Sequence, residues 1–396
     1  MGSFISGFFN YIQFSVDDVM ARSPLAVFFL FAPALAFDTM RYYITNTAIF
    51  FLDLFRRETA ENEPVTYLPK VSAIVPVRNE GERLKLTIDS ILESNYPKLE
   101  VIIVDDCSED RTQELCRPYE EKGLIKYIRT TVRSGKPAAV NYGFKFATGE
   151  IVIHFDGDVA IDRDAIREAI KPFEDLKVGA VSGNLKVRND RESLVTRLQA
   201  AEYGMGISVG RRWAALTDTL QIASGAFSCF RKEVLADVKG ADPEYGEDLD
   251  LTLKTRKLGF KVAFAPKAVA MTDVPNTWFG LFKQRVRWDR CYVRINLRKH
   301  KNMFDFRVFR WGDFFAGIQD IIFNLILVLL FPVYILFILL FVPQLFLFII
   351  VITYLFYTVM NFGQFVIVAL LSERPARDAI FVLYTPLFFP YSLFLR

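Results

Sequence analysis

Acidic residues follow two segments that have the composition of buried β-strands. Residues 99–104 lead into Asp105-Asp106-Cys107-Ser108, and residues 150–155 lead into Asp156-Gly157-Asp158. Two carboxylates one residue apart, separated by a glycine that permits a tight turn, suit a hard cation such as Mg²⁺ or Mn²⁺ held together with phosphate oxygens. Capping or turn formation by Asp106, Ser108 and Asp158 is the alternative, and it accounts for one cluster more easily than for both.

A lysine and a second acidic pair lie at two predicted helix starts. Lys136, in Ser134-Gly135-Lys136-Pro137, can meet a phosphate as a point charge, although a plain helix start explains this segment equally well. Glu247 and Asp248 open a helical pattern, where Asp248 can act as a general base toward an acceptor hydroxyl or simply cap the helix. The chain has neither GxGxxG nor GxxxxGK[ST], so a nucleotide must be held in another way.

Gln284-Arg285-Val286-Arg287-Trp288 lies in a basic segment just before an apolar region. A juxtamembrane helix that contacts anionic head groups, with Trp288 as an interfacial anchor, explains the charge. Arginine and tryptophan are also the residues that hold a pyrophosphate and stack on a sugar ring.

The segments that must position these residues alternate between strand and helix patterns. Short β-rich runs at residues 71–77, 99–104, 126–128, 150–155 and 178–182 are separated by amphipathic helical patterns. This order predicts an α/β fold with a doubly wound, mostly parallel sheet, in which ligands bind at the carboxyl ends of the strands. Both Asp106 and Asp156 follow such ends.

Apolar segments flank this region. Residues 314–341 and 345–371 are long enough to span a bilayer, and residues 379–395 are barely so. Near the N-terminus we expect one spanning helix from Leu25 to a girdle at Arg41-Tyr42-Tyr43, followed by an interfacial helix; one long helix with an Asp38/Arg41 pair is the alternative. Asp320 is either a channel or packing residue or part of an interfacial lead-in helix.

The predicted division is therefore an N-terminal membrane segment at 1–64, a soluble domain at 65–300, and an interfacial helix with two to three spans at 301–396. The distribution of Lys and Arg places the soluble domain in the cytoplasm and the turn at Val342-Pro343-Gln344 on the other side. We expect a multi-pass integral protein of the cell membrane.

Composition excludes several classes of protein. A formal charge of +3 is too small to favour nucleic acid as a partner. Four cysteines without a CxxC pair and only two histidines support neither a disulfide framework nor a zinc site, which fits a reducing compartment.

Taken in order, these motifs resemble the membrane-embedded family 2 glycosyltransferases with a GT-A fold, which include the synthases of hyaluronan, chitin oligomers, poly-N-acetylglucosamine and cellulose. The resemblance rests on Asp106 in VDD, Asp156-Gly157-Asp158 as DxD, Gly246-Glu247-Asp248 as GED and residues 284–288 as QxxRW, over roughly residues 70–300. Supporting matches are Pro76-Val77-Arg78-Asn79-Glu80, Gly135-Lys136, Ser182-Gly183-Asn184 and Ser224-Gly225-Ala226-Phe227.

The resemblance implies roles for these residues. Asp106 would contact the uracil and ribose of a UDP-sugar, and Asp158 with Asp156 would meet Mg²⁺ or Mn²⁺ and the diphosphate. Asp248, next to Glu247, would be the base of an inverting displacement. The rest of the nucleotide-sugar site would comprise Pro76, Arg78, Glu80, Lys136, Gln284, Arg287 and Trp288, and the acceptor would contact Trp288 and the loop Ser224, Gly225, Ala226 and Phe227.

Three hypotheses remain open at this point. The first is a processive synthase that elongates and exports a β-linked polysaccharide, and GED with SGAF favours an amino-sugar polymer over cellulose. The second is a transferase that adds one sugar to a lipid acceptor. The third, a non-enzymatic scaffold, predicts the loss of a catalytic carboxylate or of Trp288, and all are present. With four apolar segments at most, a channel would favour a homo-oligomer or a partner subunit.

Overall fold

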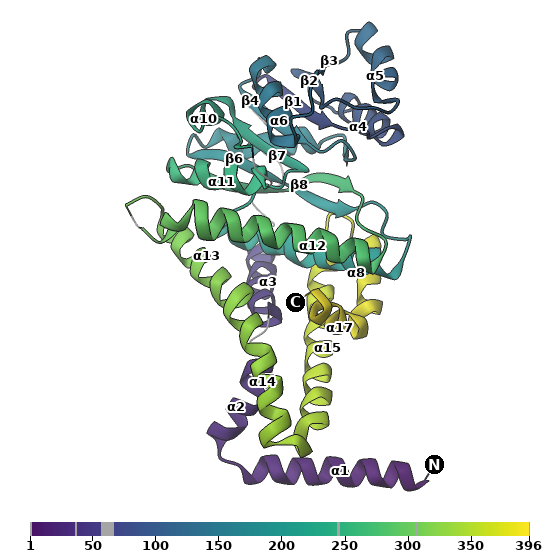
Figure 1. Cartoon of the computed structure of the whole chain (residues 1–396), viewed down its shortest axis with the longest axis vertical. Coiled ribbons are helices and arrows are strands. Elements are labelled where there is room, and N and C mark those ends of the chain that lie inside the picture. The colour runs from purple at the N-terminus through teal and green to yellow at the C-terminus, as the bar shows by residue number, and fades with distance from the viewer. Residues whose placement is uncertain (1, 36–37, 57–66, 244–245, 306, 396) are drawn as a thin grey trace.

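The computed structural model describes residues 2–35, 38–56, 67–243, 246–305 and 307–395. Figure 1 shows three levels: an α/β domain, a long helix α12 (Trp278–Tyr292) that crosses beneath it, and a stalk of apolar helices that extends away from the domain. Helix α1 (Gly2–Ala21) runs across the far end of the stalk.

One mixed eight-stranded sheet forms the centre of the domain, with the order β3-β2-β1-β4-β7-β6-β8-β5. Strands β3, β2, β1 and β4 are mutually parallel, whereas β7 runs antiparallel to both of its neighbours, β4 and β6. The strands are β1 (Val71–Val77), β2 (Leu99–Asp105), β3 (Lys126–Arg129), β4 (Ile151–Phe155), β5 (Ala160–Ile161), β6 (Val178–Val187), β7 (Phe227–Arg231) and β8 (Lys261–Thr272).

The predicted α/β fold is confirmed, and all five predicted strands are present. Strands β5, β7 and β8 were not predicted. Strand β8 contains Pro266 and Lys267 and pairs with β6 through a register shift, which interrupts the apolar run that identifies a buried strand. Strand β7 begins at Phe227, the last residue of the SGAF sequence, and is only five residues long.

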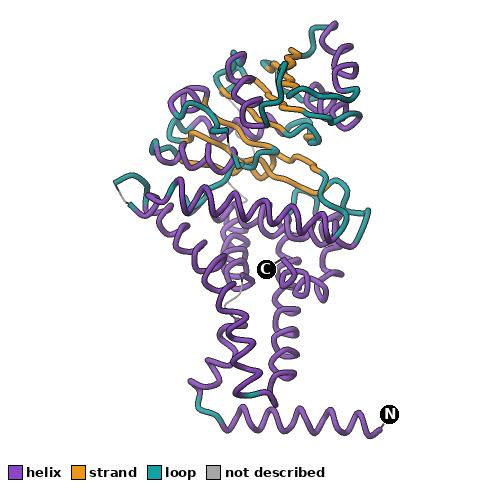
Figure 2. The backbone as a smooth tube through the Cα atoms, in the orientation of Figure 1, coloured by secondary structure: helices purple, strands orange, loops and turns teal. Residues whose placement is uncertain are grey.

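Helices cover both faces of the sheet because alternate residues of a strand point to opposite faces. Val71, Ala73 and Val75 of β1 share a core cluster with Leu84 and Ile88 of helix α4, whereas Ile74 belongs to a second cluster with Ala139 of α6 and Leu251 of α11. Figure 2 shows these layers. The helices of the domain are α4 (Glu82–Leu92), α5 (Thr112–Glu121), α6 (Lys136–Phe146), α7 (Ala165–Ile170), α8 (Leu194–Tyr203), α9 (Gly210–Leu216), α10 (Lys232–Asp237) and α11 (Glu247–Lys257).

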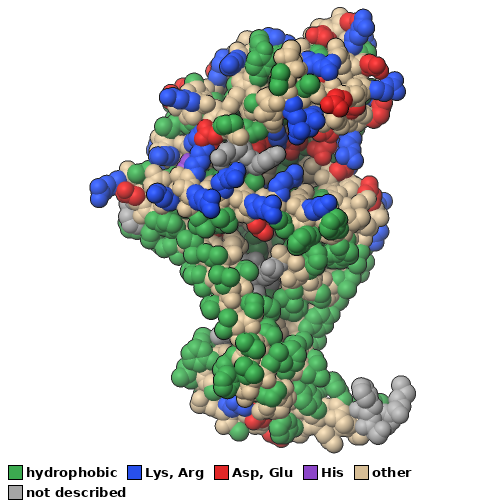
Figure 3. Space-filling model, viewed as in Figure 1, with side chains coloured by type: hydrophobic (Ala, Val, Ile, Leu, Met, Phe, Trp, Pro, Cys, Tyr) green, Lys and Arg blue, Asp and Glu red, His purple; other side chains and the backbone are tan. Residues whose placement is uncertain are grey.

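Within the described residues, three helical stretches are long and apolar enough to cross a membrane: Trp311–Phe341, Pro343–Leu371 and Pro375–Leu395. They contain α13 (Trp311–Ile321), α14 (Leu327–Phe341), α15 (Phe346–Leu371), α16 (Pro375–Asp378) and α17 (Thr385–Leu395). The three predicted C-terminal segments are thus confirmed as apolar helices, with a break at the predicted turn at Pro343. Apolar side chains cover this stalk, whereas charged side chains gather over the α/β domain (Figure 3).

The N-terminal region differs from its prediction. Helix α2 (Pro24–Leu35) is followed by α3 (Asp38–Arg56), which passes through residues 41–43 without the predicted break. The proposed Asp38/Arg41 pair lies outside the residues whose side chains are described. Helix α1 was not predicted; its Tyr11 hydroxyl donates to the Gln344 carbonyl at 2.9 Å, beside the turn between α14 and α15.

Ion pairs join the α/β domain to the helical stalk. Lys186 of β6 lies 2.6 Å from Asp378 of α16, and Arg212 of α9 lies 2.7 Å from both Asp53 of α3 and Glu373. These contacts fix the sheet against the apolar helices, so residues from both parts can line one cavity.

Candidate active site

A cavity of about 1020 Å³ lies between the α/β domain and the apolar helices. Of the site residues predicted from the sequence, those that line it are Lys136, Asp156, Asp158, Ser224, Gly225, Ala226, Glu247, Asp248, Gln284, Arg287 and Trp288. They come from the carboxyl end of β4, the start of α6, the loop before β7, the start of α11, and α12. The structure therefore brings the DxD, GED, SGAF and QxxRW elements together around one space.

Lys136 joins two of these elements. Its ammonium group lies 2.6 Å from Asp156 Oδ1 and 2.7 Å from Glu247 Oε1. Burial alone would raise the pKa values of both carboxyls, but the neighbouring ammonium outweighs this effect and lowers them. Asp156 and Glu247 are therefore ionised at neutral pH.

Asp158 and Glu80 show the opposite effect. Burial, reinforced by the nearby Asp156 carboxylate, raises the pKa of Asp158 to about 6. Burial and the charges of Asp158 and Asp156 also raise the pKa of Glu80. Carboxylates crowded in this way repel one another, and a cation bound among them would relieve that repulsion.

Asp248 lies in the first turn of α11. Its Oδ2 accepts a hydrogen bond from the Gly225 backbone N–H at 3.0 Å, and its Oδ1 accepts one from the Leu249 N–H at 2.8 Å. Burial raises the pKa of Asp248, the adjacent Glu247 raises it further, and Lys136 opposes both effects. A fixed carboxylate with a raised pKa is suited to accept a proton.

Asp106 holds the loop that presents Lys136. Its two carboxylate oxygens accept hydrogen bonds from the backbone N–H groups of Ser134 at 2.7 Å and Gly135 at 2.8 Å. It is 4% exposed and is not among the residues that line the cavity. A contact between Asp106 and a nucleotide base stays a prediction.

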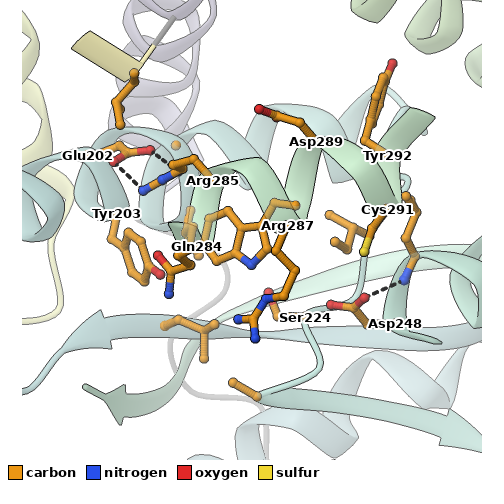
Figure 4. Close-up of a pocket in the computed structure, with 18 of the residues that line it drawn as sticks. Glu202, Tyr203, Ser224, Asp248, Gln284, Arg285, Arg287, Asp289, Cys291 and Tyr292 are labelled. Carbon is orange, nitrogen blue, oxygen red and sulfur yellow. Dashed lines mark hydrogen bonds and ion pairs between the residues drawn. The ribbon is translucent and has the colours of Figure 1, made fainter. Parts of the chain in front are cut away.

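Helix α12 contributes the QxxRW element, as Figure 4 shows. The side chain of Arg287 extends toward the loop that carries Ser224, whereas Arg285 extends toward Glu202 of α8. Both oxygens of Glu202 accept hydrogen bonds from Arg285 at 2.8 Å. The two arginines of this element thus have different surroundings.

Several predicted site residues are not among those that line the cavity, although Glu80 lies next to the Asp156-Gly157-Asp158 turn. Pro76 is buried within β1, and Arg78 and Glu80 follow that strand. Phe227, predicted in the acceptor loop, is fully buried at the start of β7, where its ring centroid lies 4.8 Å from that of Phe155. Phe227 is therefore a core residue, because the loop ends one residue earlier than the SGAF pattern indicates.

The cavity also has lining residues that the motifs did not identify. Arg211 donates to Ser182 Oγ at 2.8 Å, and burial lowers its pKa to about 10. From the apolar helices come Asp320, Asn324, Asn361 and Gln364. The amides interrupt segments that are otherwise apolar, and this was the signal that could have singled them out. Asp320 lines the cavity, as the channel interpretation of this residue requires.

A divalent cation at this site would be held partly by protein carboxylates and partly by the substrate. Within the described part of the chain, no three His, Cys, Asp or Glu side chains form a group that could hold a metal ion. Mg²⁺ in phosphate-transfer sites usually takes only one or two protein carboxylates and completes its shell with phosphate oxygens and water. The Asp156 and Asp158 carboxylates match that smaller contribution.

Comparisons with known proteins identify the family of the α/β domain. Residues 72–239 match the family described as "Glycosyl transferase family 2". A poly-beta-1,6-N-acetyl-D-glucosamine synthase of Staphylococcus epidermidis is 32% identical over 275 residues, which are 68% of this chain and 66% of that protein. A Staphylococcus aureus protein of the same name is 31% identical over 262 residues, 65% of this chain and 63% of that protein. The match thus spans slightly less than two thirds of these curated relatives.

Among solved structures, a mannosyltransferase from Pyrobaculum calidifontis in complex with GDP-Man and Mn²⁺ is similar in fold. It has a TM-score of 0.62 and 23% sequence identity, and the match covers 90% of this chain and 99% of that one. This likeness supports the GT-A architecture around the cavity. The chain therefore carries a domain of the glycosyl transferase family 2, spanning residues 72–239.

Proposed function

We propose that this protein is an inverting membrane glycosyltransferase that elongates a β-linked polysaccharide from a UDP-sugar. The observation that carries the proposal is the shared cavity. Asp248, Trp288 and Lys136 line it together with Asn324, Asn361 and Gln364 of the apolar helices. A product released from the acceptor end of the site would thus lie beside polar side chains at the level of the apolar helices.

The donor is proposed to be an N-acetylated amino sugar carried by UDP. The GED and SGAF sequences favour this class, and the names of the staphylococcal relatives support it. Lys136 and Arg287 would face the diphosphate from two sides of the cavity. The aromatic face of Trp288 would stack on the acceptor sugar.

The proposed reaction is a single displacement. Asp248 takes the proton from an acceptor hydroxyl, whose oxygen forms a bond to the anomeric carbon while the bond from that carbon to the UDP oxygen breaks. Asp158 and Asp156 would hold Mg²⁺ or Mn²⁺, and such an ion would supply positive charge next to the diphosphate leaving group. The hydrogen bonds from Gly225 and Leu249 keep the Asp248 carboxylate fixed during the proton transfer.

The proposed topology places the α/β domain in the cytoplasm. The turn at residues 342–344 carries no Lys or Arg, whereas the α/β domain and the segment around Arg374 and Arg377 are rich in both. A UDP-sugar made in the cytoplasm would then reach the site directly.

The test is a donor panel with the purified full-length chain in lipid vesicles. UDP release and product size are measured with each UDP-sugar in Mg²⁺, Mn²⁺ or EDTA, beside Asp248→Asn and the exposed control Asp237→Asn. We expect long product from one amino-sugar donor with the wild type and Asp237→Asn only. A single sugar added to lipid would overturn the polymer proposal, and unchanged turnover in Asp248→Asn would overturn the assignment of the base.

A further inference from the structure

The last helix of the chain contacts the QxxRW element through one carboxylate. Tyr391 of α17 donates its hydroxyl to Glu202 Oε2 at 2.5 Å, and the same carboxylate accepts both hydrogen bonds from Arg285. Tyr391 is 2% exposed. Glu202 therefore joins three segments that are far apart in the chain, namely α8, α12 and α17.

Arg285 in turn contacts Trp288. The guanidinium carbon lies 4.5 Å from the centroid of the Trp288 ring, a cation–π contact between residues three positions apart on one helix. Because the bidentate pair with Glu202 fixes the plane of the guanidinium, it also restricts where the indole can lie. Glu202, Arg285, Trp288 and Tyr391 all line the cavity.

Helix α17 also holds α12 at its first turn. The ring of Trp278, the first residue of α12, lies 4.9 Å from that of Phe394 and 6.2 Å from that of Tyr391. The end of the chain therefore contacts α12 at its start and, through Glu202, at the position that precedes Trp288 by one helical turn. A displacement of α17 would therefore disturb α12 both at Trp278 and at Arg285.

The two arginines of QxxRW differ in their exposure and in their charged neighbours. Arg287 is exposed in the cavity, and its charge contributes to lowering the pKa of Asp156, after the larger effect of Lys136. Arg285 has its charge balanced by Glu202, and its side chain is only 17% exposed. Because both terminal nitrogens of Arg285 donate to Glu202, its guanidinium is held at α8, and we assign it a different role from that of Arg287.

We infer that Arg285, Glu202 and Tyr391 are positioning residues that fix the Trp288 ring at the acceptor end of the cavity and so couple acceptor binding to the last apolar helix. The inference rests on the proposed function and deepens it. The hydroxyl of Tyr391 donates to the same Glu202 oxygen, Oε2, that accepts a hydrogen bond from Arg285, and so adds α17 to this contact. Loss of that hydroxyl frees the carboxylate, the guanidinium and the indole to move together.

The test compares Tyr391→Phe with Tyr384→Phe in vesicle-reconstituted full-length protein. Tyr384 is a matched control because its hydroxyl also contacts a charged residue of α8, Arg197 at 2.5 Å, but it does not line the cavity. KM for the UDP-sugar and KM for a short β-linked N-acetylglucosamine oligosaccharide are measured separately. UDP release to water, without acceptor, is measured beside them.

For Tyr391→Phe we expect an increase of about tenfold in acceptor KM, the scale of one hydrogen bond to a charged group. Donor KM and UDP release to water stay at the wild-type values, as do all three quantities in Tyr384→Phe. Arg285→Lys keeps the charge but loses the planar bidentate geometry, and we expect the same acceptor-specific effect.

A combined variant separates positioning from general stability. In a Trp288→Leu background, adding Tyr391→Phe should leave acceptor KM unchanged, because no aromatic ring remains for the Arg285 guanidinium to position. Equal effects of Tyr391→Phe and Tyr384→Phe, or full additivity with Trp288→Leu, would overturn the inference while leaving the proposed function intact. A wild-type chain without transferase activity would overturn both.

Discussion

The carboxylate of Asp248 accepts a hydrogen bond from the backbone N–H of Gly225 at 3.0 Å. The loop before β7 therefore holds the side chain at the start of α11, although the two lie 23 residues apart in the chain. The hydrogen bond restricts the orientation of a carboxylate that lines the cavity. The consequence for the reaction can be tested through its pH dependence.

We expect the rate of sugar transfer to fall at acidic pH along a limb set by Asp248. Burial and Glu247 raise its pKa above the ordinary 3.8, so the base becomes protonated, and inactive, at a higher pH than an exposed aspartate. Lys136 and Arg211 are cationic groups that also interact with the Asp248 carboxylate. The measurement is kcat/KM against pH in the wild type; a flat profile down to pH 4 would contradict the assignment.

Lys136→Met should weaken donor binding and move the acidic limb. The change removes the cation between Asp156 and Glu247 and leaves both carboxylates without their nearest opposite charge. We expect donor KM to rise by about tenfold or more. Because Lys136 also lowers the pKa of Asp248, the limb should shift to higher pH, and Lys145→Met, on the same helix, should show neither effect.

Gly246→Ala should impair the site more than Gly259→Ala does. Both glycines flank α11 and have positive φ, +92° and +90°, so both variants carry a backbone penalty of about 1–2 kcal/mol. Only at Gly246 would the new Cβ lie 2.6 Å from Ile295 Cδ1 and 3.2 Å from Cys291 Cβ, whereas at Gly259 it meets nothing within 4 Å. We expect similar losses of thermal stability from the backbone but a clear loss of kcat in Gly246→Ala alone. Equal kcat values would contradict this reasoning.

The helix that carries Asp248, α11, is joined to α13 by a buried ion pair. Arg256 and Asp313 are both fully buried, and the guanidinium also donates to Asp218 Oδ1 at 3.1 Å. Arg256→Met should lower the free energy of unfolding by about 3–5 kcal/mol, because it leaves the Asp313 carboxylate buried without its partner.

Thermal unfolding in detergent checks this prediction. The double variant Arg256→Met/Asp313→Leu should be more stable than Arg256→Met, because no uncompensated charge remains. Lys257→Met, at the adjacent exposed position, serves as the control. If the loss of stability in the double variant, relative to the wild type, equals the sum of the losses in the two single variants, the two residues are not coupled as described.

Much of the catalytic half of the site could be predicted from local sequence. The strands that precede Asp106 and Asp156 are continuous apolar runs, and parallel neighbours place their carboxyl ends at one edge. The start of α11 follows from its acidic residues and leucine spacing, and the C-terminal apolar helices follow from length alone. Such features depend on residues a few positions apart, so the chain reveals them without its fold.

Contacts between distant segments were decided only by the tertiary structure. Strand β7 enters the sheet antiparallel, which draws Phe227 into the core and leaves Ser224, Gly225 and Ala226 at the cavity. Glu202 meets Tyr391 across 189 positions of the chain, and no local pattern marks either residue. Periodicity shows which face of an element is buried, but the partner on that face is chosen by how all the buried surfaces pack together, and only the folded chain contains that information.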